Sequence, residues 1–543
     1  MASGERIQLA ETKQIMPVEQ VYALARQYQQ SGHLAAAADL CRQLVEQRPK
    51  HADGLHLMGI ICHQEGDLIA AMDFIRRAIK VKGTVPLYHS NLGEMCRQAG
   101  RLDEAIAAGK RALELQPNLP STLNNLGIAY FDREDFPAAE RYYRRALALD
   151  PNFAEAHNNL ANVLRQQHKF EEAIPEYARA MELKPGYADA AANLASVLHI
   201  SGRFEEAMSS CRWALTLNPN QPHAHTGLGI LHLLHADLPQ GWPEYEWRLL
   251  MPESRHVAPP GPAWDGSNPA GRKILIYGEQ GFGDALQFCR YLPMLRDLGA
   301  TVFLRLPQPV VGLIGDSMPG IDVSSSQGLP AYDCHCALVS LPHRFQTRLN
   351  TIPNPLGYLR ARPETAGKWA ARLGSGPELK VGVVWTGNPK HVNNRYRAVA
   401  AEALLPLLAI EGTRFFSLQV GGRHGELTKC SNGAVPDFSA ELTDYAETAG
   451  VIANLDLVVS ICTSVSHLAG AMGKPLWMLL NAVPDWRWML ERADNPWYPS
   501  ARLFRQRKPG EWTDVIERVG AELRAVVAGE RGRLTPYLRE PAR

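Results

Sequence analysis

One short loop carries the residue types that a close-fitting turn and acid–base chemistry require. Gly278-Glu-Gln-Gly-Phe-Gly-Asp284 follows an apolar run at 273–277 and opens an amphipathic stretch at 285–298, which predicts a buried strand, a tight turn and a helix. Its inner glycines allow the backbone to approach a ligand closely, and Asp284 falls where a helix N-cap is expected. The loop has neither the Gly-x-Gly-x-x-Gly spacing of dinucleotide sites nor the Lys-Ser/Thr of a P-loop, so neither nucleotide fingerprint applies.

Two later loops carry hydroxyls and positive charge that suit a phosphate. Thr386-Gly-Asn-Pro-Lys-His391 follows an apolar run at 381–385, and Cys462-Thr-Ser-Val-Ser-His467 follows another at 457–460. Ligands of parallel sheets bind beyond the carboxyl ends of the strands, and a helix N-terminus attracts anions. The sequence therefore predicts a nucleotide-phosphate site built from Thr386, Asn388, Lys390, Arg397, Thr463, Ser464 and His467. Two alternatives remain open: His467 can fill a capping turn, and 390–397 can be a solvated basic loop.

Four aromatic residues gather in two short motifs near the C-terminus. Pro484-Asp-Trp-Arg-Trp488 and Asn495-Pro-Trp-Tyr-Pro499 contain three tryptophans and one tyrosine. Aromatic rings stack on bases and sugars, but they more often pack between elements. We expect packing for most of these rings, with Asp485 and Arg487 as residues of a cleft.

These loops require a frame in which strands and helices alternate. Strands are predicted at 274–277, 302–306, 381–385, 414–418, 457–460 and 476–479, with helices between them, as at 285–298 and 445–453. Such alternation predicts parallel sheets covered by helices. The segment 354–380 lacks strand signals and carries Pro355, Pro363, Gly374 and Gly376. It is therefore predicted to link a first lobe at 273–360 to a second lobe at 378–528, which a loose tail at 529–543 follows.

The first half of the chain repeats with a period of 34 residues. Small side chains let antiparallel helices approach closely, and a proline or glycine ends the second helix of each pair. The pattern predicts a tetratricopeptide-repeat (TPR) α-solenoid at 16–255, with six full units, a degenerate seventh and a Pro/Gly-rich linker at 256–272. The lattice holds prolines at 49, 117, 151, 185 and 219 with Gly83 at the missing node, small residues from Ala25 to Gly229 and from Ala37 to Ala207, and a third series of Ala78, Ala112, Ala146, Ala180 and Ala214 that ends in Arg248.

Asparagine recurs at one position of this lattice, at Asn91, Asn125, Asn159 and Asn193. Equivalent positions lie on one side of a solenoid, whose stacked repeats expose a concave groove. An asparagine amide offers two donors and an acceptor, which is enough to hold an extended peptide whatever its side chains are. The alternative is that these amides satisfy hydrogen bonds between repeats. The series predicts either a groove for an acceptor protein or an internal ladder.

Composition argues against several classes of protein. The 57 basic and 56 acidic residues leave a formal net charge of +1, so no global field favours nucleic acid or an acidic membrane. The 9 cysteines are scattered, and Cys334 and Cys336 lack a second pair at zinc-finger spacing, which favours free thiols in a reducing compartment. No apolar window approaches the roughly 18 residues of a membrane span. With no signal core at the N-terminus, a cytoplasmic protein of two or more domains is expected.

The second half resembles the catalytic half of bacterial TPR glycosyltransferases, which is related to the lipopolysaccharide heptosyltransferases of glycosyltransferase family 9. The likeness lies in residues 278–293, Trp385-Thr-Gly-Asn-Pro389, 456–475, Pro484-Asp-Trp-Arg-Trp488 and 495–506. The resemblance implies a glycosyltransferase-B (GT-B) fold of two Rossmann-like lobes, with the acceptor at the first lobe and the nucleotide-sugar at the second. It also implies that a helix at 511–527 returns to the first lobe.

The resemblance implies roles for single residues as well. Asp284 matches the heptosyltransferase aspartate that serves as general base, and Glu279 is the competing carboxylate. The family usually has an aspartate where this chain has Cys462, and the change is compatible with an altered donor, a less active enzyme or a neutral substitution. No metal or cofactor is expected, because hydroxyls, Lys, Arg and a helix terminus can hold the leaving phosphate and the catalytic half has no Asp-x-Asp motif.

Together these points predict an inverting glycosyltransferase that moves a hexose, a heptose or a nonulosonic acid from a nucleotide-activated donor to Ser or Thr of a protein. The family includes enzymes implicated in glycosylating flagellin, which is the acceptor that the resemblance implies. A similar asparagine ladder grips peptides in the eukaryotic O-linked N-acetylglucosamine transferases, which favours recruitment of the protein by the repeats. Two alternatives remain: an acceptor in lipopolysaccharide or exopolysaccharide, and a non-catalytic TPR scaffold with a degenerate transferase domain.

Overall fold

The computed structural model describes residues 6–8, 15–251, 258–326, 328, 330–389 and 393–536 of the 543-residue chain. Lys390, which was predicted to bind the donor, lies outside the described residues. Contacts within the chain divide it into two compact units, Met1–Val197 and Leu198–Arg543. A short antiparallel pair, β1 (Arg6–Gln8) with β2 (Ile15–Pro17), precedes the first helix.

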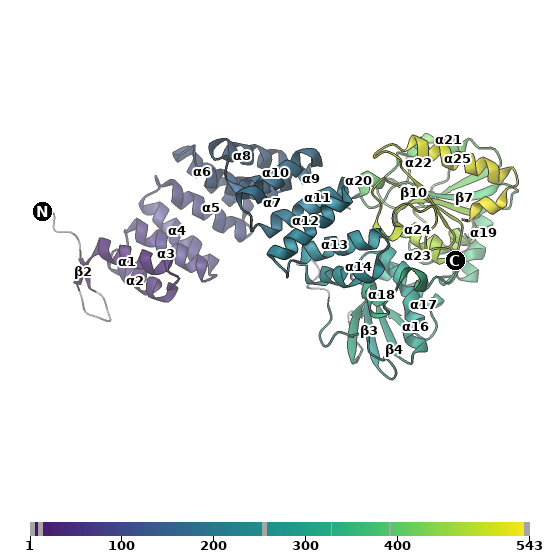
Figure 1. Ribbon diagram of the computed structural model, residues 1–543, viewed down its shortest axis with the longest axis horizontal. Coiled ribbons are helices and arrows are strands. Elements are labelled where there is room, and N and C mark those ends of the chain that lie inside the picture. The colour runs from purple at the N-terminus through teal and green to yellow at the C-terminus, as the bar shows by residue number, and fades with distance from the viewer. Residues whose placement is uncertain are drawn as a thin grey trace. The chain divides into compact units, whose positions relative to one another are not determined.

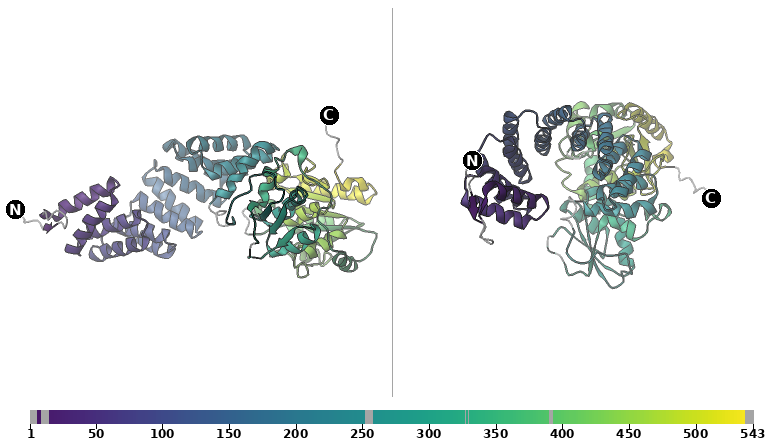
Figure 2. Two further views of the ribbon diagram at one scale, coloured as in Figure 1. Left: turned by 90° about the horizontal axis from the view of Figure 1, so that it is seen from below. Right: turned by 60° about the vertical axis from the view of Figure 1, so that its left-hand side comes forward.

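Fourteen helices of the described chain form successive antiparallel pairs (Figures 1 and 2). In the first six pairs the first helix has 13 residues and the second has 14, as the 34-residue period predicts. The helices are α1 (Val18–Gln30), α2 (Leu34–Gln47), α3 (Ala52–Gln64), α4 (Leu68–Val81), α5 (Pro86–Gln98), α6 (Leu102–Leu115), α7 (Pro120–Asp132), α8 (Phe136–Leu149), α9 (Ala154–Gln166), α10 (Phe170–Leu183), α11 (Ala188–Ile200), α12 (Phe204–Leu217), α13 (Pro222–Leu234) and α14 (Leu238–Tyr245). The predicted TPR α-solenoid is confirmed.

Small residues of the lattice lie where two helices touch. A Cβ atom at Gly127 of α7 would come within 2.6 Å of the Tyr143 ring of α8, and one at Gly59 of α3 would come within 2.8 Å of Ile75 of α4. Ala139 and Ala173 have no exposed surface. Because protein interiors are close-packed, larger side chains at these positions would separate the helices, which is why the lattice is visible in the sequence.

The second unit contains two parallel sheets. The four-stranded sheet has the order β5-β4-β3-β6 and the five-stranded sheet has the order β11-β10-β9-β7-β8, with every neighbouring pair parallel. All six predicted strands are present, and β5, β6 and β11 are additional. The strands are β3 (Lys273–Tyr277), β4 (Thr301–Arg305), β5 (Asp322–Ser324), β6 (Cys334–Ala337), β7 (Leu379–Val384), β8 (Thr413–Ser417), β9 (Leu457–Ile461), β10 (Leu476–Leu480) and β11 (Ala501–Arg505).

The strand orders fix where ligands are expected. In the five-stranded sheet the chain moves from β7 outward to β8 and then back past β7 to β9, so the connections after β7 and β9 leave toward opposite faces. Such a switch point opens a crevice at the carboxyl ends of the two strands. In the four-stranded sheet the same change of direction separates β3 from β6. The loops after β3, β7 and β9 are the three that the sequence singled out.

Helices cover the sheets (Figure 1). They are α15 (Phe282–Phe288), α16 (Leu292–Asp297), α17 (Gln308–Ser317), α18 (Leu341–Arg344), α19 (Pro363–Leu373), α20 (Asn394–Arg397), α21 (Leu405–Leu408), α22 (Glu426–Cys430), α23 (Tyr445–Ala453), α24 (Ser464–Ala471) and α25 (Thr513–Val527). The segment predicted as an interlobe link thus contains a helix, α19. The expectation that 511–527 returns to the first lobe is wrong, because Val515, Val519 and Leu523 of α25 pack in the core of the five-stranded sheet.

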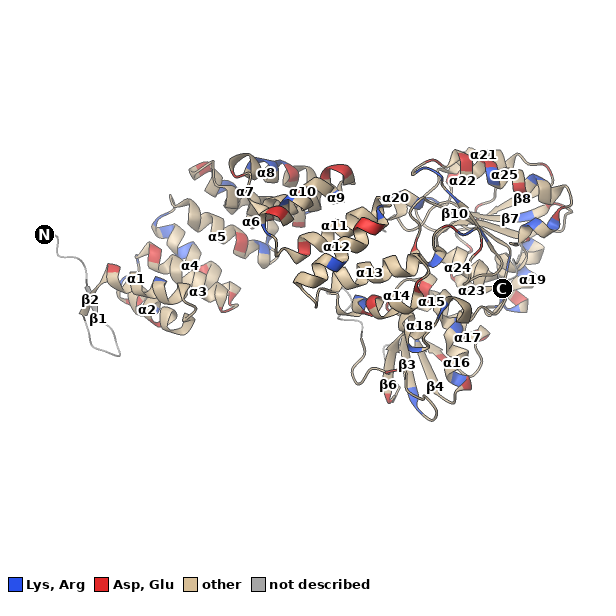
Figure 3. Cartoon of the chain, viewed as in Figure 1, with Lys and Arg blue, Asp and Glu red and all other residues tan. Residues whose placement is uncertain are grey.

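Acidic and basic residues are interspersed along the helices (Figure 3). Many form ion pairs that bridge neighbouring repeats, such as Arg97 of α5 with Asp132 of α7 at 2.9 Å. Among the described helices, none combines the length and the apolar character needed to cross a lipid bilayer.

Candidate functional site

A cavity of about 1040 Å³ lies at the carboxyl ends of strands from both sheets. Its wall includes the loops after β3, β7, β8 and β9 together with the start of α23. The lining residues are 280–284, 307, 309, 384, 386–389, 397, 418–423, 442–445, 448, 462–465, 467, 485 and 487. Asp284, Thr386, Asn388, Arg397, Thr463, Ser464 and His467 are therefore all brought to one cavity. The asparagine series lies elsewhere, in the repeats.

Asp284 occupies the third position of α15, not the N-cap that the sequence predicted. The N-cap is Gly281, and Oδ2 of Asp284 accepts a hydrogen bond of 3.0 Å from the Gly281 backbone N–H. The carboxylate thus caps the helix from inside its first turn. Gly283 has to be glycine because a Cβ atom there would lie 2.8 Å from the ring of His467 on α24. This contact lets the first turn of α15 pack directly against α24.

Arg487 is the ionic partner of Asp284. Its Nη2 bonds Asp284 Oδ1, and its Nη1 donates to both carboxylate oxygens of Asp485, at 2.9 and 3.1 Å. The Arg487 side chain is 8% exposed and lies over the Trp486 ring, 4.2 Å from its centroid. Burial raises the pKa of the Asp284 carboxyl, the guanidinium of Arg487 lowers it and the Asp485 carboxylate raises it, with a net rise above the ordinary value. Such a carboxylate suits proton transfer.

Glu279, the competing carboxylate, does not reach the cavity. It is not among the residues that line the cavity, and its side chain is 2% exposed. Its Oε1 accepts a bond of 2.8 Å from Arg248, a residue of the 3₁₀ helix η1 (Glu246–Leu250) that ends the seventh repeat. Burial raises the pKa of Glu279 and Arg248 lowers it, leaving a net rise. Of the two carboxylates that the sequence singled out, Asp284 lines the cavity and Glu279 does not.

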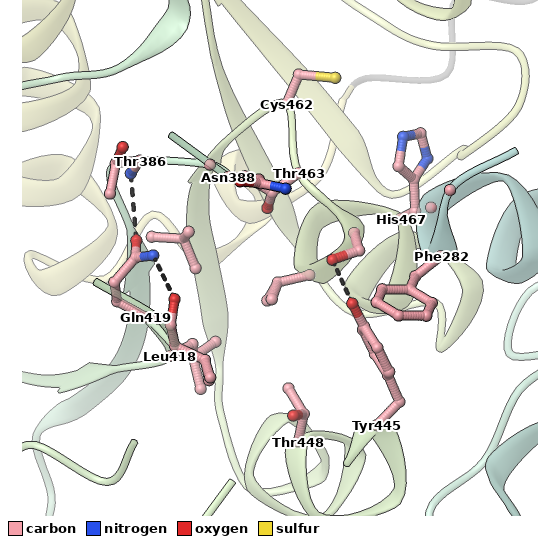
Figure 4. Close-up of a pocket in the computed structure, with 18 of the residues that line it drawn as sticks. Phe282, Thr386, Asn388, Leu418, Gln419, Tyr445, Thr448, Cys462, Thr463 and His467 are labelled. Atoms are coloured by element: carbon pink, nitrogen blue, oxygen red, sulfur yellow. Dashed lines mark hydrogen bonds between the residues drawn. The ribbon is translucent and has the colours of Figure 1, made fainter. Parts of the chain in front are cut away.

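The loop after β7 is held in place by one buried asparagine. Asn394 Nδ2 donates to the Thr386 hydroxyl at 3.2 Å, and its Oδ1 accepts from the Gly387 N–H at 2.7 Å. Gln419, two residues after the end of β8, accepts from the Thr386 N–H at 3.2 Å (Figure 4). The Thr386 hydroxyl is therefore partly used by the protein itself. Gln419 is not among the predicted site residues, although its place directly after the strand predicted at 414–418 indicates such a role.

The loop after β9 ends in a helix N-terminus that lines the cavity. Thr463 is the N-cap of α24, and its N–H donates to Ser466 Oγ at 3.1 Å. Ser464 Oγ accepts a bond of 2.6 Å from the hydroxyl of Tyr445 (Figure 4). The N–H groups of Ser464 and Val465 have no acceptor among the described residues. Unpaired first-turn N–H groups of this kind bind phosphate and carboxylate oxygens.

His467 cannot contribute a positive charge to this wall. It is buried between Trp488 and Tyr498, and its Nδ1 lies 2.9 Å from the Tyr498 hydroxyl. Burial, reinforced by the nearby Arg487, lowers the pKa of His467 to about 3, so the imidazole is neutral. Its predicted role is thereby reduced to a hydrogen bond.

Cys462 stands at the cavity wall where the family resemblance leads one to expect an aspartate. The residue is 9% exposed, and burial raises the pKa of its thiol. It therefore offers a neutral surface to a ligand. The charges that act on the thiol include those of Asp485, Arg397 and Arg487, all of which line the cavity.

The aromatic motifs divide as expected. Trp486, Trp488, Trp497 and Tyr498 are buried at 4% exposure or less, whereas Asp485 and Arg487 line the cavity. A second aromatic pair was not foreseen: Phe282, 37% exposed, lies 5.4 Å from Tyr445 between ring centroids (Figure 4). It joins α15 to α23 at the cavity, and its ring offers a surface on which a sugar or base can stack.

The seventh repeat packs into the same unit as the cavity. Trp242 Nε1 of α14 donates to the Thr347 carbonyl at 2.9 Å, and its ring meets Trp486 edge-to-face at 5.5 Å. The Tyr245 hydroxyl accepts from Gln280 Nε2 at 3.1 Å. With the Arg248–Glu279 pair, these contacts attach the end of the repeat array to the loop after β3.

The asparagine series forms bonds within the solenoid. Asn159 Nδ2 donates to Asn124 of the preceding repeat at 3.0 Å, and Asn193 Nδ2 donates to Asn158 at 3.5 Å. Asn91 Nδ2 lies 2.9 Å from the imidazole Nε2 of His56, again one repeat back. Three of the four asparagine amides thus use a donor in a bond to the preceding repeat. Their predicted role in binding an acceptor protein stays a prediction.

Comparison with known proteins identifies the repeats. Two family models, both described as tetratricopeptide repeat, match the chain, one at residues 85–152 and the other at 22–86, 124–188 and 159–222. The first half is therefore a TPR array.

One curated relative extends the comparison. The chain is 26% identical over 316 residues to Protein FlbA of Caulobacter vibrioides, which covers 53% of this chain and 53% of that protein. The chain spans about half the length of the curated relative it matches. Among solved structures, it is similar to PilF of Pseudomonas aeruginosa (19% identity, 38% of this chain, 94% of that chain, TM-score 0.35) and to PilW, described as a type IV pilus biogenesis factor (20% identity, 39% and 98%, TM-score 0.37).

Proposed function

We propose that this protein is an inverting glycosyltransferase that moves a sugar from a nucleotide-activated donor to a Ser or Thr hydroxyl of a protein. The observation that carries the proposal is the cavity, in which a carboxylate of raised pKa and the N-terminus of α24 belong to loops from two parallel sheets. On this account the sheets are the two Rossmann-like lobes of a GT-B fold.

The donor phosphate binds at the second lobe. The free N–H groups of Ser464 and Val465 and the guanidinium of Arg397 face the phosphate, with Lys390 as a further predicted contact. These groups take up the negative charge that develops on the nucleotide as the bond to the sugar breaks. The proposed scheme requires no metal ion.

Asp284 acts on the acceptor side. As the acceptor hydroxyl attacks the anomeric carbon on the face opposite the nucleotide, its proton passes to the Asp284 carboxylate, and the nucleotide leaves with the electron pair of the broken bond. Inversion at the anomeric carbon follows from this single displacement. A positioned base typically contributes about 10²–10⁴-fold to the rate.

The repeats bring in the acceptor. TPR arrays present an extended concave surface, and the amides of Asn91, Asn125, Asn159 and Asn193 lie at equivalent places on successive repeats. Flagellin is the acceptor protein that the family resemblance implies. The acceptor carbonyl and N–H groups pair with the amide positions that the inter-repeat bonds leave unused.

Calorimetric titration tests the donor site. The full-length protein is titrated with UDP, GDP, ADP and CMP and with their sugar conjugates, and one of these is expected to bind. Arg397→Ala should weaken that binding by about tenfold or more, since a charged hydrogen bond is worth roughly 1.5–3 kcal/mol. Arg414→Ala, an exposed residue of β8 outside the cavity, is the matched control. Equal affinity in wild type and Arg397→Ala would remove the cavity as the donor site.

A further inference from the structure

Arg487 joins carboxylates from two separate parts of the cavity wall. Asp284 belongs to α15, which follows β3 of the four-stranded sheet, and Asp485 lies after β10 of the five-stranded sheet. Each terminal nitrogen of the guanidinium serves one carboxylate: Nη2 bonds Asp284, and Nη1 bonds Asp485 at 2.9 and 3.1 Å. The planar fork of arginine makes such a double contact possible, whereas a lysine ammonium on its flexible stem does not reproduce it.

The arginine is itself held firmly. It belongs to the 3₁₀ helix η6 (Trp486–Trp488), whose N-cap Asp485 accepts from the Arg487 backbone N–H at 3.0 Å. The Arg487 carbonyl accepts a bond of 2.8 Å from the buried Asn495 side chain. With its ring contact to Trp486, these bonds leave the guanidinium little freedom to move away from Asp284.

The other charged groups around Asp284 are accounted for. Glu279, on the same loop, has Arg248 as its ionic partner, and His467, which packs against Gly283, is neutral. Gln280 contributes an uncharged amide, 3.5 Å from Arg487. Among the described residues, the ion pairs of Asp284 are thus limited to Arg487, and Asp485 is the carboxylate that competes for that cation.

We propose that Arg487 is a positioning residue that holds Asp284 ionised and in place at the cavity, and that Asp485 moderates this effect by sharing the guanidinium. As far as the reaction is concerned, the inference rests on the proposed function. The guanidinium of Arg487 favours the deprotonated base, whereas burial favours the protonated acid. Asp485 prevents the ion pair from weakening the base too far.

The inference predicts opposite shifts from two neighbouring changes. Arg487→Gln removes the cation, so the pKa of Asp284 should rise by about 1–3 units, the usual effect of an opposite charge at contact distance. Asp485→Asn removes a like charge and leaves Arg487 to Asp284 alone, so the pKa should fall. Arg487→Lys should lie between wild type and Arg487→Gln. A merely structural role would shift both variants in one direction or neither.

Infrared difference titration measures this without any activity. The carboxyl band of Asp284 is identified as the one that Asp284→Asn lacks, and its midpoint is followed against pH in the full-length protein. Arg492→Gln, which removes a nearby arginine paired to Asp494 outside the cavity, is the matched control and should leave the midpoint unchanged. If Arg487→Gln does not fold, the downward shift in Asp485→Asn still decides. An unmoved midpoint in Asp485→Asn, or an upward one, overturns the inference.

The pH profile of kcat/KM for sugar transfer to flagellin adds the catalytic consequence. Activity of an enzyme with a general base falls below the pKa of that base, so the acid limb should move up in Arg487→Gln and down in Asp485→Asn. Opposite infrared shifts in a protein that transfers no sugar would keep the inference and remove the proposed function. Transfer with unmoved acid limbs and unmoved infrared midpoints would keep the function and remove the inference.

Discussion

Five of the first six repeats carry alanine at a position where the seventh carries arginine, and this arginine contacts the loop after β3 that leads into the cavity. Ala78, Ala112, Ala146, Ala180 and Ala214 have no exposed surface, and each lies in the second helix of its pair. Arg248 occupies the next node of the lattice and is 5% exposed. The second helix of that pair is 8 residues long instead of 14 and continues as a 3₁₀ helix. At this lattice position the alanines are buried within their own helix pairs, whereas the arginine of the seventh repeat bonds a residue outside the repeats.

The difference shows how a repeat array can end inside another domain. A small residue at this position is too short to contact anything beyond the repeats. Arg248 instead bonds Glu279 of the loop after β3 and Ser340 of the 3₁₀ helix η3 (Leu338–Ser340). Trp242 and Tyr245 of the same repeat form further hydrogen bonds, with Thr347 and Gln280. The feature that made the seventh repeat look degenerate in sequence is the one that attaches the array to the candidate site.

The largest effect should come from the cavity side of this comparison. Asp284→Asn keeps the shape of the side chain and its bond to the Gly281 N–H but removes its basicity. Transfer should fall by about 10²–10⁴-fold while the fold is kept. Steady-state kinetics with thermal melting measure both, and Asp297→Asn, an exposed aspartate of α16, is the matched control. Near-wild-type turnover in the folded Asp284 variant would eliminate Asp284 as the base.

The next effect concerns the attachment itself. Arg248→Met leaves Glu279 buried without its cation, which should lower the free energy of unfolding by about 3–5 kcal/mol. Removing both charges, in Arg248→Met with Glu279→Gln, should recover most of the loss. Denaturant unfolding measures the change, with Arg212→Met, an exposed arginine of α12, as the control from the regular repeats. A loss of stability equal to that of the control would show that the pair does not hold the array to the site.

The same variant should show a defined pH dependence. Glu279 already has a raised pKa in the folded protein, and loss of Arg248 raises it further. When the pKa of a carboxyl group is higher in the folded than in the unfolded state, the folded protein loses stability as pH rises from the unfolded-state pKa to the folded-state pKa. The deficit of Arg248→Met should therefore shrink as pH falls to the ordinary range of glutamate. Unfolding curves at neutral and acidic pH would contradict this if the deficit were constant.

A smaller effect is expected from a glycine of the seventh repeat, measured against the equivalent glycine of a regular repeat. A Cβ atom at Gly229 of α13 would lie 2.5 Å from the backbone nitrogen of Tyr245, whereas one at Gly93 of α5 would lie 3.1 Å from the Ala105 carbonyl. Gly229→Ala should cost about 1–3 kcal/mol by overpacking and should also slow transfer, because Tyr245 bonds Gln280. Gly93→Ala should be close to neutral, since alanine gains about 1 kcal/mol in helix propensity. Equal melting temperatures for the two variants would break the comparison.

The smallest effects belong to the asparagine series. Each neutral hydrogen bond lost in Asn91→Ala, Asn125→Ala, Asn159→Ala or Asn193→Ala is worth about 0.5–1.5 kcal/mol. If the amides hold the acceptor, a combined variant should modify the protein more slowly while donor hydrolysis is unchanged. If they serve only the bonds between repeats, the melting temperature should fall instead. Equal modification by wild type and a stable quadruple variant would leave the groove without a role in recruitment.

Local pattern made much of this molecule predictable. The 34-residue lattice predicted the helix pairs because small residues are required wherever two helices touch, and apolar runs predicted six of the nine strands described in the two parallel sheets. β5 was missed because it has only 3 residues, and β6 and β11 were missed because Cys334-His-Cys-Ala337 and Ala501-Arg-Leu-Phe-Arg505 mix polar and apolar residues. Three of the loops that line the cavity, those after β3, β7 and β9, were predicted from their places after strands.

Contacts between distant segments could not be predicted in this way. Arg487 and Asp284 are 203 residues apart, and nothing local to either indicates that their loops meet. The pairing of Arg248 with Glu279 is of the same kind: the lattice marks the arginine as unusual, but its partner depends on how the last repeat packs. The burial that makes His467 neutral likewise arises from Trp488 and Tyr498, which follow it by 21 and 31 residues.

The most direct test of the central claim is the intact mass of flagellin. Flagellin is purified from cells with the wild-type gene, from cells lacking it and from cells that carry only Asp284→Asn. The account predicts mass increments of one or more sugar residues in the first sample and unmodified protein in the other two. Identical flagellin masses in all three samples would contradict it.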